Sequence, residues 1–426
     1  MEAYMRVSMR FVILLFLIYC PFSQLQALTL NEALEIAQKH PVLQSHDLNI
    51  RGREHEAKNA NARGASSISF NSENFGGSQR GFSNVESSVE FSLPIQDRKK
   101  VKARTKLARA RIDLSKLEKT SAAWIIQNQT QRAFHRALTA RLLAEKAEEN
   151  IDNAEKMVSA AQIMVEAGAT AERENFQAEL LLQEAKLEHQ SLLGKFEDAK
   201  ADLAIAMGLD SLQNQSIEGS ATIDLELPAI DKLERLALGS HPEILAGNLL
   251  TDEVQAKLEV IRAENRPEWE ITAGARNLRE TSQHDFLIGI TVELPRSRDN
   301  VGERQALQSD IERLALEKAN KARELRLQLL NAWQKFTRLQ KQSKKVRDEI
   351  LPASYHLFEL ALTGYQLGKT DQIVVLQTQK EFLNHRNNYL QNLEELYESM
   401  DYIESLAVPA SLAQQNSPSE PLNEQK

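Results

Sequence analysis

The feature that most constrains the fold is a stretch of 73 residues, from Ile95 to Ala167, that contains neither glycine nor proline. At about 1.5 Å per residue, one helix over this stretch would be about 110 Å long, far beyond an ordinary globular domain. Its second half repeats apolar residues at steps of four and three, as in a coiled-coil seam: Ala147, Ile151, Ala154, Val158, Ala161 and Val165. A turn signal at 166–170 and a second helical run, Ala171 to Met207, follow. These patterns predict a very long antiparallel helical hairpin.

The first 27 residues predict a secretory signal peptide. Arg6 and Arg10 precede an apolar core of about ten residues, and the segment ends at the small residue Ala27. That core is too short to span a membrane, and no later run reaches the ~18 apolar residues that a spanning helix needs. We expect cleavage after Ala27. The alternative is acylation of Cys20, the only cysteine, which Tyr19 disfavours because a small residue is expected before an acylated cysteine.

Composition limits the class of protein. Aromatic residues make up only 6% of the chain, while helix-forming residues dominate, which favours extended helices over several compact cores. A net charge of −8 argues against a nucleic-acid partner. The nine histidines include no helical pair with an adjacent carboxylate, and no phosphate-binding glycine loop is present. We therefore expect no enzyme activity, catalytic residue, metal site or cofactor, and we interpret His40 and His241 as residues that end a helix before proline.

Internal repeats predict the domain organisation. His40-Pro41 recurs as His241-Pro242, and Leu93-Pro94 recurs as Leu294-Pro295, both at an offset of 201 residues. The turn at 165–170 recurs at 365–370, at an offset of 200. We expect two tandem copies, 28–225 and 226–408, each with a helix, a β-hairpin (66–95 and 268–296) and a long helical hairpin (tips at 166–170 and 364–370). The polar tail, 409–426, is expected to be disordered.

The expected strands alternate between apolar and polar residues. In the second strand Val85, Val89, Phe91 and Leu93 oppose Glu86, Ser88, Glu90 and Ser92. In the third strand Trp269, Ile271, Ala273 and Ala275 oppose Glu270, Thr272, Gly274 and Arg276; in the fourth, Phe286, Ile288, Ile290 and Val292 oppose Leu287, Gly289, Thr291 and Glu293. The first strand, around Ile68 and Phe70, is ambiguous. An ordinary amphipathic sheet packed on a helix would show the same alternation.

The number of strands favours a membrane barrel instead. Each run is close to the ~9 to 11 residues that cross a bilayer as a tilted strand. One chain has only four such runs, and open strand edges cannot face lipid because their N–H and C=O groups would lack partners. Two chains would give eight strands with a filled interior, whereas three would give twelve and leave a passage. A homotrimer is the smallest assembly of this kind that conducts.

The order and spacing of these landmarks resemble the outer-membrane efflux family, the TolC-like channel-tunnels. The resemblance covers essentially the whole mature chain and rests on the segment Leu28 to Ala37, the His-Pro and Leu-Pro pairs, and the turns at Gly168 and Gly368. It implies a mainly helical homotrimer, with a twelve-stranded β-barrel in the bacterial outer membrane and an α-helical tunnel across the periplasm. In the second copy the four-three spacing recurs at Leu325, Leu329, Ala332, Phe336, Leu339, Ser343, Val346 and Ile350. Pro352 is expected to break or kink that helix, where the family has a belt of short helices around the tunnel.

The partners and cargo also follow from this resemblance. The family conducts passively, and its tunnel tip meets a periplasmic adaptor protein and an inner-membrane pump. The short chain is similar to members that serve heavy-metal pumps of the RND type, so heavy-metal cations are the expected cargo. Drugs or other small molecules are the alternative.

The first hairpin tip is the expected gate. In the family, a tip glycine and small residues precede an acidic residue that helps to constrict the entrance. Gly168 and Thr170 then place Glu174 at the acidic position. Three copies around an axis would bring three Glu174 side chains together in a site that attracts cations.

The second tip departs from the family pattern. Gly368 and Thr370 place Val374 where the family has an acid, so only half of the anionic gate is present. Lys369 and Asp371 flank this gap, and an interchain salt bridge between them would hold the closed state. The alternative is that these charges only solvate the end of a coiled coil.

Acidic residues also dominate the expected lumen face of the barrel. Glu86, Glu90, Glu270 and Glu293 outnumber Arg276 there. This excess predicts a modest preference for cations, weakened by screening over about 8 Å at physiological salt.

Two other functions fit parts of the sequence. A periplasmic adaptor also has a signal peptide and a long helical hairpin, but it carries one hairpin, whereas this chain has two. A structural coiled-coil protein would leave the strand pairs unexplained.

Overall fold

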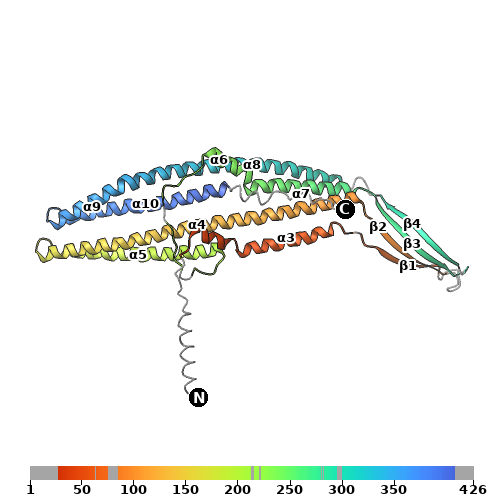
Figure 1. Ribbon diagram of the computed structural model, residues 1–426, viewed down its shortest axis with the longest axis horizontal. Coiled ribbons are helices and arrows are strands. Elements are labelled where there is room, and N and C mark those ends of the chain that lie inside the picture. The colour runs from red at the N-terminus through yellow and green to blue at the C-terminus, as the bar shows by residue number, and fades with distance from the viewer. Residues whose placement is uncertain are drawn as a thin grey trace, which may run out of the picture. The chain divides into compact units, whose positions relative to one another are not determined.

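The structure is a computed structural model that describes residues 27–62, 64–74, 85–212, 215–219, 222–279, 281, 283–294 and 300–407 (Figure 1). Cys20, the rest of the predicted signal peptide before Ala27, and the predicted tail 409–426 lie outside these residues.

The described chain is mainly helical, with one antiparallel sheet of four strands, as predicted. The first half contains α2 (Leu30–Ala37), α3 (Pro41–Asn59), β1 (Ser67–Glu73), β2 (Glu86–Ile95), α4 (Arg98–Glu166) and α5 (Glu172–Met207). The second half contains α6 (Ile230–Ser240), α7 (Pro242–Glu264), β3 (Glu268–Leu278), β4 (Gln283–Glu293), α8 (Val301–Lys345), the π-helical segment η1 (Val346–Ile350), α9 (Leu351–Gln366) and α10 (Gln372–Leu406). Two helices, two strands and two long helical segments thus occur in the same order twice. The division into tandem copies after residue 225 stays a prediction.

The long glycine- and proline-free stretch forms one uninterrupted helix, α4, of 69 residues. Of the predicted seam, Ala147, Ala154 and Ala161 are buried. The larger seam residues between them are only partly buried. Met157 and Ala160 are also buried, in a cluster with residues of α9 and α10, so α4 packs on two partners.

The seam of the second hairpin agrees with its prediction as far as Ser343. Its buried members are Leu325, Leu329, Ala332, Phe336, Leu339 and Ser343. The helix break predicted at Pro352 takes the form of the π-helical segment η1, after which α9 begins at Leu351. Because proline has no N–H, it cannot donate to the carbonyl four residues earlier, and a wider turn directly before it accommodates this loss. The belt of short helices expected at this level stays a prediction.

Both hairpin tips use the same glycine turn. Gly168 and Gly368 have φ of 66°, a left-handed conformation that favours glycine. The amide of Ala169 donates to the carbonyl of Met164, and that of Gly168 to Val165, which is the Schellman pattern. The amides of Lys369 and Gly368 repeat it at the second tip. The predicted turns are confirmed at both positions.

The chain divides into two compact units, each assembled from segments that are far apart in the sequence. The first comprises Met1–His40, Trp124–Leu227 and Asn331–Ser405; the second comprises Pro41–Ala123, Pro228–Leu330 and Leu406–Lys426. In the first unit, α2 packs on α4 and α5, and Leu28, Ala33, Leu203 and Ile217 are at most 3% exposed in this core.

The second unit carries the sheet. Lys100, near the start of α4, pairs with Glu268 at the start of β3 over 2.7 Å, and Asp97 pairs with Arg266. His241 ends α6, as expected, and also caps α7, because its Nδ1 accepts a hydrogen bond from the amide of Glu243. Burial lowers the pKa of His241, which favours the neutral ring that this cap requires. In the part of the chain that the structure describes, no helix is both long and apolar enough to cross a membrane.

Candidate functional site

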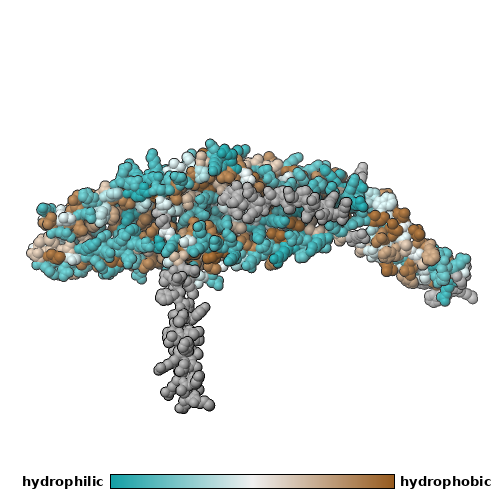
Figure 2. All heavy atoms as spheres, viewed as in Figure 1, coloured by the Kyte–Doolittle hydropathy of each residue, from teal (hydrophilic) through white to brown (hydrophobic). Residues whose placement is uncertain are grey.

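The sheet exposes one continuous apolar face. Strand order is β1-β2-β3-β4, and the register places Val89 opposite Phe70 and Ala275, and Ile271 opposite Ile290. The exposed members of this face, at 37–89% exposure, are Ile68, Phe70, Val89, Phe91, Leu93, Ile95, Trp269, Ile271, Phe286, Ile288, Ile290 and Val292. Figure 2 shows hydrophobic residues gathered over these strands. A patch of this kind marks contact with a membrane or another protein. The predicted faces are confirmed, and the ambiguous first strand belongs to the same apolar face.

The apolar face ends at a polar row near the hairpin turns. Ser72, Ser87, Asn277 and His284 lie opposite one another across the four strands. From Phe286 to Val292 the band extends about 20 Å along β4. Transmembrane barrels carry an apolar band about 25 Å tall. The band on this sheet is therefore of the right order for a bilayer.

The opposite face of the sheet carries the predicted acids. Glu86, Glu90, Glu270 and Glu293 share it with Arg276, which pairs with Glu86 over 3.6 Å. Gly274 lies opposite Glu90, and a Cβ there would come within 2.8 Å of the Glu90 side chain and 2.6 Å of the Val89 carbonyl oxygen. Glycine thus lets Glu90 lie across β3. The shared face of these acids is an observation, whereas its orientation toward a lumen stays a prediction.

The two edges of the sheet are open within the described residues. β1 pairs only with β2, and β4 pairs only with β3. Their outer backbone groups must find partners elsewhere if the apolar face enters lipid.

The tips of the two helical hairpins are joined within one chain. The hydroxyl of Tyr365, in α9, donates to Oε2 of Glu174, in α5, over 3.3 Å. Nε2 of Gln372, the first residue of α10, donates to the carbonyl oxygen of Glu174 over 2.9 Å. Burial, and next the charge of Glu174, raise the pKa of Tyr365 to about 12, so the phenol stays a donor. The predicted gate residue Glu174 is therefore the centre of an intrachain contact, here called the tip latch.

The remaining predicted tip residues have local positions. Thr170 and Thr370 lie at the ends of their turns. Thr370 packs against Gly364, and a Cβ added at Gly364 would lie only 2.3 Å from the hydroxyl oxygen of Thr370. Lys369 and Asp371 flank Thr370, and their predicted interchain salt bridge stays a prediction. Tyr365 and Gln372 were not predicted as residues of this site. Tyr365 stands three residues before Gly368, in the second tip, and Glu174 is an acid in the first tip. A tyrosine in one tip and an acid in the other were the signal that could have predicted this hydrogen bond.

His135 joins two helices. Nδ1 of His135, in α4, lies 2.9 Å from both carboxylate oxygens of Asp401, in α10, and Nε2 of Gln131 donates to the same carboxylate. Among the described residues, no group of three histidine, cysteine or acidic side chains is arranged to hold a metal ion.

The buried Arg386 has no ion-pair partner among the described residues. Arg386, in α10, is 8% exposed, and its Nε has no hydrogen-bond acceptor among the described residues. Its guanidinium lies 5.7 Å from the ring centre of Phe382. Burial lowers the pKa of Arg386, while Glu149 and Glu188 act in the opposite direction. Among the described residues, Arg386 is thus a buried charge that Glu149 and Glu188 offset only in part and that forms no ion pair.

Comparisons with known proteins support the family resemblance. Residues 54–209 match the model of the outer membrane efflux protein family. CzcC, a cobalt-zinc-cadmium resistance protein of Cupriavidus metallidurans, is 23% identical over 328 residues, which cover 75% of this chain and 76% of CzcC. Over residues 54–209 the chain thus matches the outer membrane efflux family. The resemblance inferred from the sequence is confirmed, and so is the expected outer-membrane localisation.

Solved structures show the same fold as this chain. CusC aligns with a TM-score of 0.72 at 12% identity, over 89% of this chain and 91% of CusC. VceC, an outer membrane protein of Vibrio cholerae, aligns with a TM-score of 0.71 at 16% identity, over 89% of this chain and 96% of VceC.

Proposed function

We propose that the protein is the outer-membrane channel of a tripartite efflux system and that it conducts its cargo passively. The observation that carries the proposal is the four-stranded sheet, which combines an exposed apolar face with two open edges. A chain that inserts such a sheet in lipid must cover the edges with further strands, because unpaired backbone groups are costly there.

The proposed assembly is a homotrimer. Three sheets joined between β4 of one chain and β1 of the next form a twelve-stranded barrel, with the acidic face inward. The helices form a periplasmic tunnel, and its tips meet a periplasmic adaptor and an inner-membrane pump of the RND type. The two tandem copies, 28–225 and 226–408, contribute two strands and one helical hairpin each.

The proposed cargo is heavy-metal cations. The supporting observations are the likeness to a cobalt-zinc-cadmium resistance protein and the excess of carboxylates on the polar face of the sheet. The tip latch, with Glu174 from each chain, is the proposed gate at the periplasmic entrance. A drug channel of the same family is the second candidate, because a passive conduit selects its cargo mainly through its pump.

Cysteine cross-linking tests the barrel. Cys20 is the only cysteine and precedes the expected cleavage site, so introduced pairs can be read without background. Ser69→Cys in β1 is combined in turn with cysteine at positions 285, 287, 289 and 291 of β4, all on the polar face. We expect oxidation to link three chains most strongly at one of these positions. Ser88→Cys, on the same face of an inner strand, is the matched control and should give no link. A water-soluble monomer that passes no ions through a planar bilayer would overturn the proposal.

Growth of a deletion strain tests the cargo. We expect loss of the chain to lower resistance to cobalt, zinc and cadmium ions while resistance to bile salts and dyes is unchanged. The reverse pattern would support the drug channel.

A further inference from the structure

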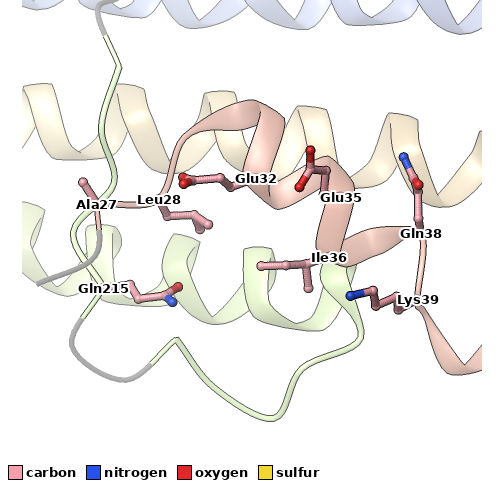
Figure 3. Close-up of a pocket in the computed structure, with 8 residues that line it drawn as sticks. All are labelled: Ala27, Leu28, Glu32, Glu35, Ile36, Gln38, Lys39 and Gln215. Atoms are coloured by element: carbon pink, nitrogen blue, oxygen red, sulfur yellow. The ribbon is translucent and has the colours of Figure 1, made fainter. Parts of the chain in front are cut away.

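A hollow of about 490 Å³ lies in the first unit, beside α2 and the segment 215–219 (Figure 3). Its lining includes Ala27, Leu28, Glu32, Glu35, Lys39 and Gln215. Ala27 is the residue after which we expect signal-peptide cleavage. The first residue of the mature chain would therefore lie in the wall of this hollow.

Leu28 is held in place by its backbone. It is 3% exposed and forms an isolated parallel bridge with the fully buried Ile217. Its amide nitrogen donates to the carbonyl oxygen of Ser216 over 2.7 Å, and its carbonyl oxygen accepts from the amide of Glu218 over 2.9 Å. A chain that begins at Leu28 keeps both hydrogen bonds, because the donor nitrogen is the same atom.

A spare acceptor lies in the same wall. Oε1 of Gln215 is buried and has no hydrogen-bond donor among the described residues. Leaving a buried amide oxygen without a partner is unfavourable. An ammonium group has three protons, whereas the amide of Leu28 has one, so cleavage creates two further donors. In Figure 3, Gln215 lies at the same end of the hollow as Ala27 and Leu28.

The charges at this end favour a cation. Glu32 accepts hydrogen bonds from the amide and the hydroxyl of Thr29, each over 2.8 Å, so its carboxylate lies beside the residue that follows Leu28. The hydrogen bond from the backbone amide of Thr29, and next the one from its hydroxyl, lower the pKa of Glu32 and keep the carboxylate ionised. Glu35 adds a second carboxylate to the lining, and the cation of the lining, Lys39, lies toward the other end of the hollow in Figure 3.

We propose that the peptide bond between Ala27 and Leu28 is the processing site and that the hollow binds the new α-ammonium group of Leu28. Water adds across the amide, so that the C–N bond breaks, the leader keeps the Ala27 carboxylate, and the Leu28 nitrogen gains protons. A signal peptidase catalyses this step, and the small side chain of Ala27 fits its requirement before the cleaved bond. Ser216 and Gln215 then accept two of the ammonium protons, and Glu32 and Glu35 supply the counter-charge. The amino terminus is thereby an anchor of α2 on the first helical hairpin.

The processing site is tested by N-terminal sequencing and intact mass of protein taken from outer membranes. We expect Leu28 as the only first residue. An acylated Cys20, or any other first residue, overturns the proposal.

The binding of the ammonium group is tested by its reactivity. Purified protein is treated with limiting acetic anhydride near pH 7, and acetylation of Leu28 is followed by mass spectrometry in folded and in denaturant-unfolded samples. We expect at least about tenfold slower acetylation in the folded protein, because the amine is buried and hydrogen-bonded. Equal rates overturn the proposal.

A pair of variants assigns the effect to the hollow. Gln215→Leu removes the spare acceptor and should raise the folded-state rate several-fold. Gln38→Leu changes a residue at the other end of the lining and should leave the rate unchanged. Equal effects of the two variants overturn the role of Gln215, and if Gln215→Leu does not fold, the comparison of folded and unfolded native protein decides.

Discussion

The phenol of Tyr365 donates a hydrogen bond to the carboxylate of Glu174, and this contact joins the two hairpin tips of one chain. A second hydrogen bond, from Gln372 to the carbonyl of the same glutamate, lies beside it. Glu174 thus accepts both hydrogen bonds, one at its side-chain carboxylate and one at its backbone carbonyl oxygen.

Tyr365→Phe should loosen the tip. A hydrogen bond to a charged group contributes about 1.5 kcal/mol, which corresponds to about a tenfold shift between latched and unlatched tips. We expect larger single-channel conductance or a higher open probability in planar bilayers. Tyr355→Phe, on the exposed part of the same helix, is the matched control. Indistinguishable traces for Tyr365→Phe and the native channel would rule out the tip latch as a gate.

Glu174→Gln tests the charge rather than the contact. The amide still offers an oxygen to Tyr365, so the latch weakens only in part, while three negative charges leave the proposed entrance. We expect reduced cation preference, measured as a reversal potential across a salt gradient. No change in reversal potential or conductance would contradict a role for Glu174 in the entrance.

Arg386→Met should stabilise the protein. Replacement removes a buried charge without an ion pair among the described residues and retains most of the side-chain volume. Replacing a buried ion pair by apolar residues of similar volume is neutral or stabilises proteins by roughly 1–4 kcal/mol, and a buried charge without an ion pair should follow the same direction. The midpoint of thermal unfolding in detergent should rise, whereas Arg338→Met, at an exposed position of α8, should leave it nearly unchanged. A lower midpoint for Arg386→Met would indicate a partner for this arginine in the assembled channel.

Glu394→Gln should raise stability in a pH-dependent way. Burial, and next the charge of Glu398, raise the pKa of Glu394, so the folded chain favours the protonated acid. The contribution of Glu394 to the free energy of unfolding is therefore complete below its unfolded pKa and is lost as the pH rises through the raised folded pKa. The melting temperature of the variant should be a few degrees above that of the native protein at pH 8, and the two temperatures should be equal near pH 4. The exposed neighbour Glu395, changed to Gln, should show no such pH trend.

Ile288→Arg should prevent insertion of the sheet. Ile288 is 85% exposed in the middle of the apolar band, and an arginine at the bilayer midplane of a barrel costs about 2–4 kcal/mol. We expect the variant to be lost from outer-membrane fractions. Thr291→Arg, on the polar face of the same strand, should still be recovered there. Equal recovery of both variants would contradict the assignment of the two faces.

Periodic features were predictable from the sequence. The seam alanines of α4, the glycine turns and the alternating strands each depend on residues close together in the chain, so local pattern was enough. In β1 the alternation is short, so the sequence alone did not show which residues form its apolar face. The register of β1 with β2 places Ile68 and Phe70 on that face.

The tip latch was not predictable in the same way. Tyr365 and Glu174 are 191 residues apart, and their contact depends on how two hairpins pack. Arg386 was missed for the same reason, because its burial follows from α10 packing among other helices. At Pro352 the sequence predicted a break, and only the structure shows that a single wide turn keeps the helix going.

That wide turn, Val346–Ile350, sets the rotational phase of α9. Each residue advances a helix by about 100°, so removing one residue from this segment would rotate all later side chains by that angle. Phe358, Ala361 and Tyr365 would swing away from Met157, with which they now cluster. A deletion in this segment lies about four helical turns before Tyr365 and touches no residue of either tip, yet it would break the contact between Tyr365 and Glu174. Loop-length changes are well tolerated elsewhere in proteins, but here the number of residues between the wide turn and the tip determines whether Tyr365 can reach Glu174.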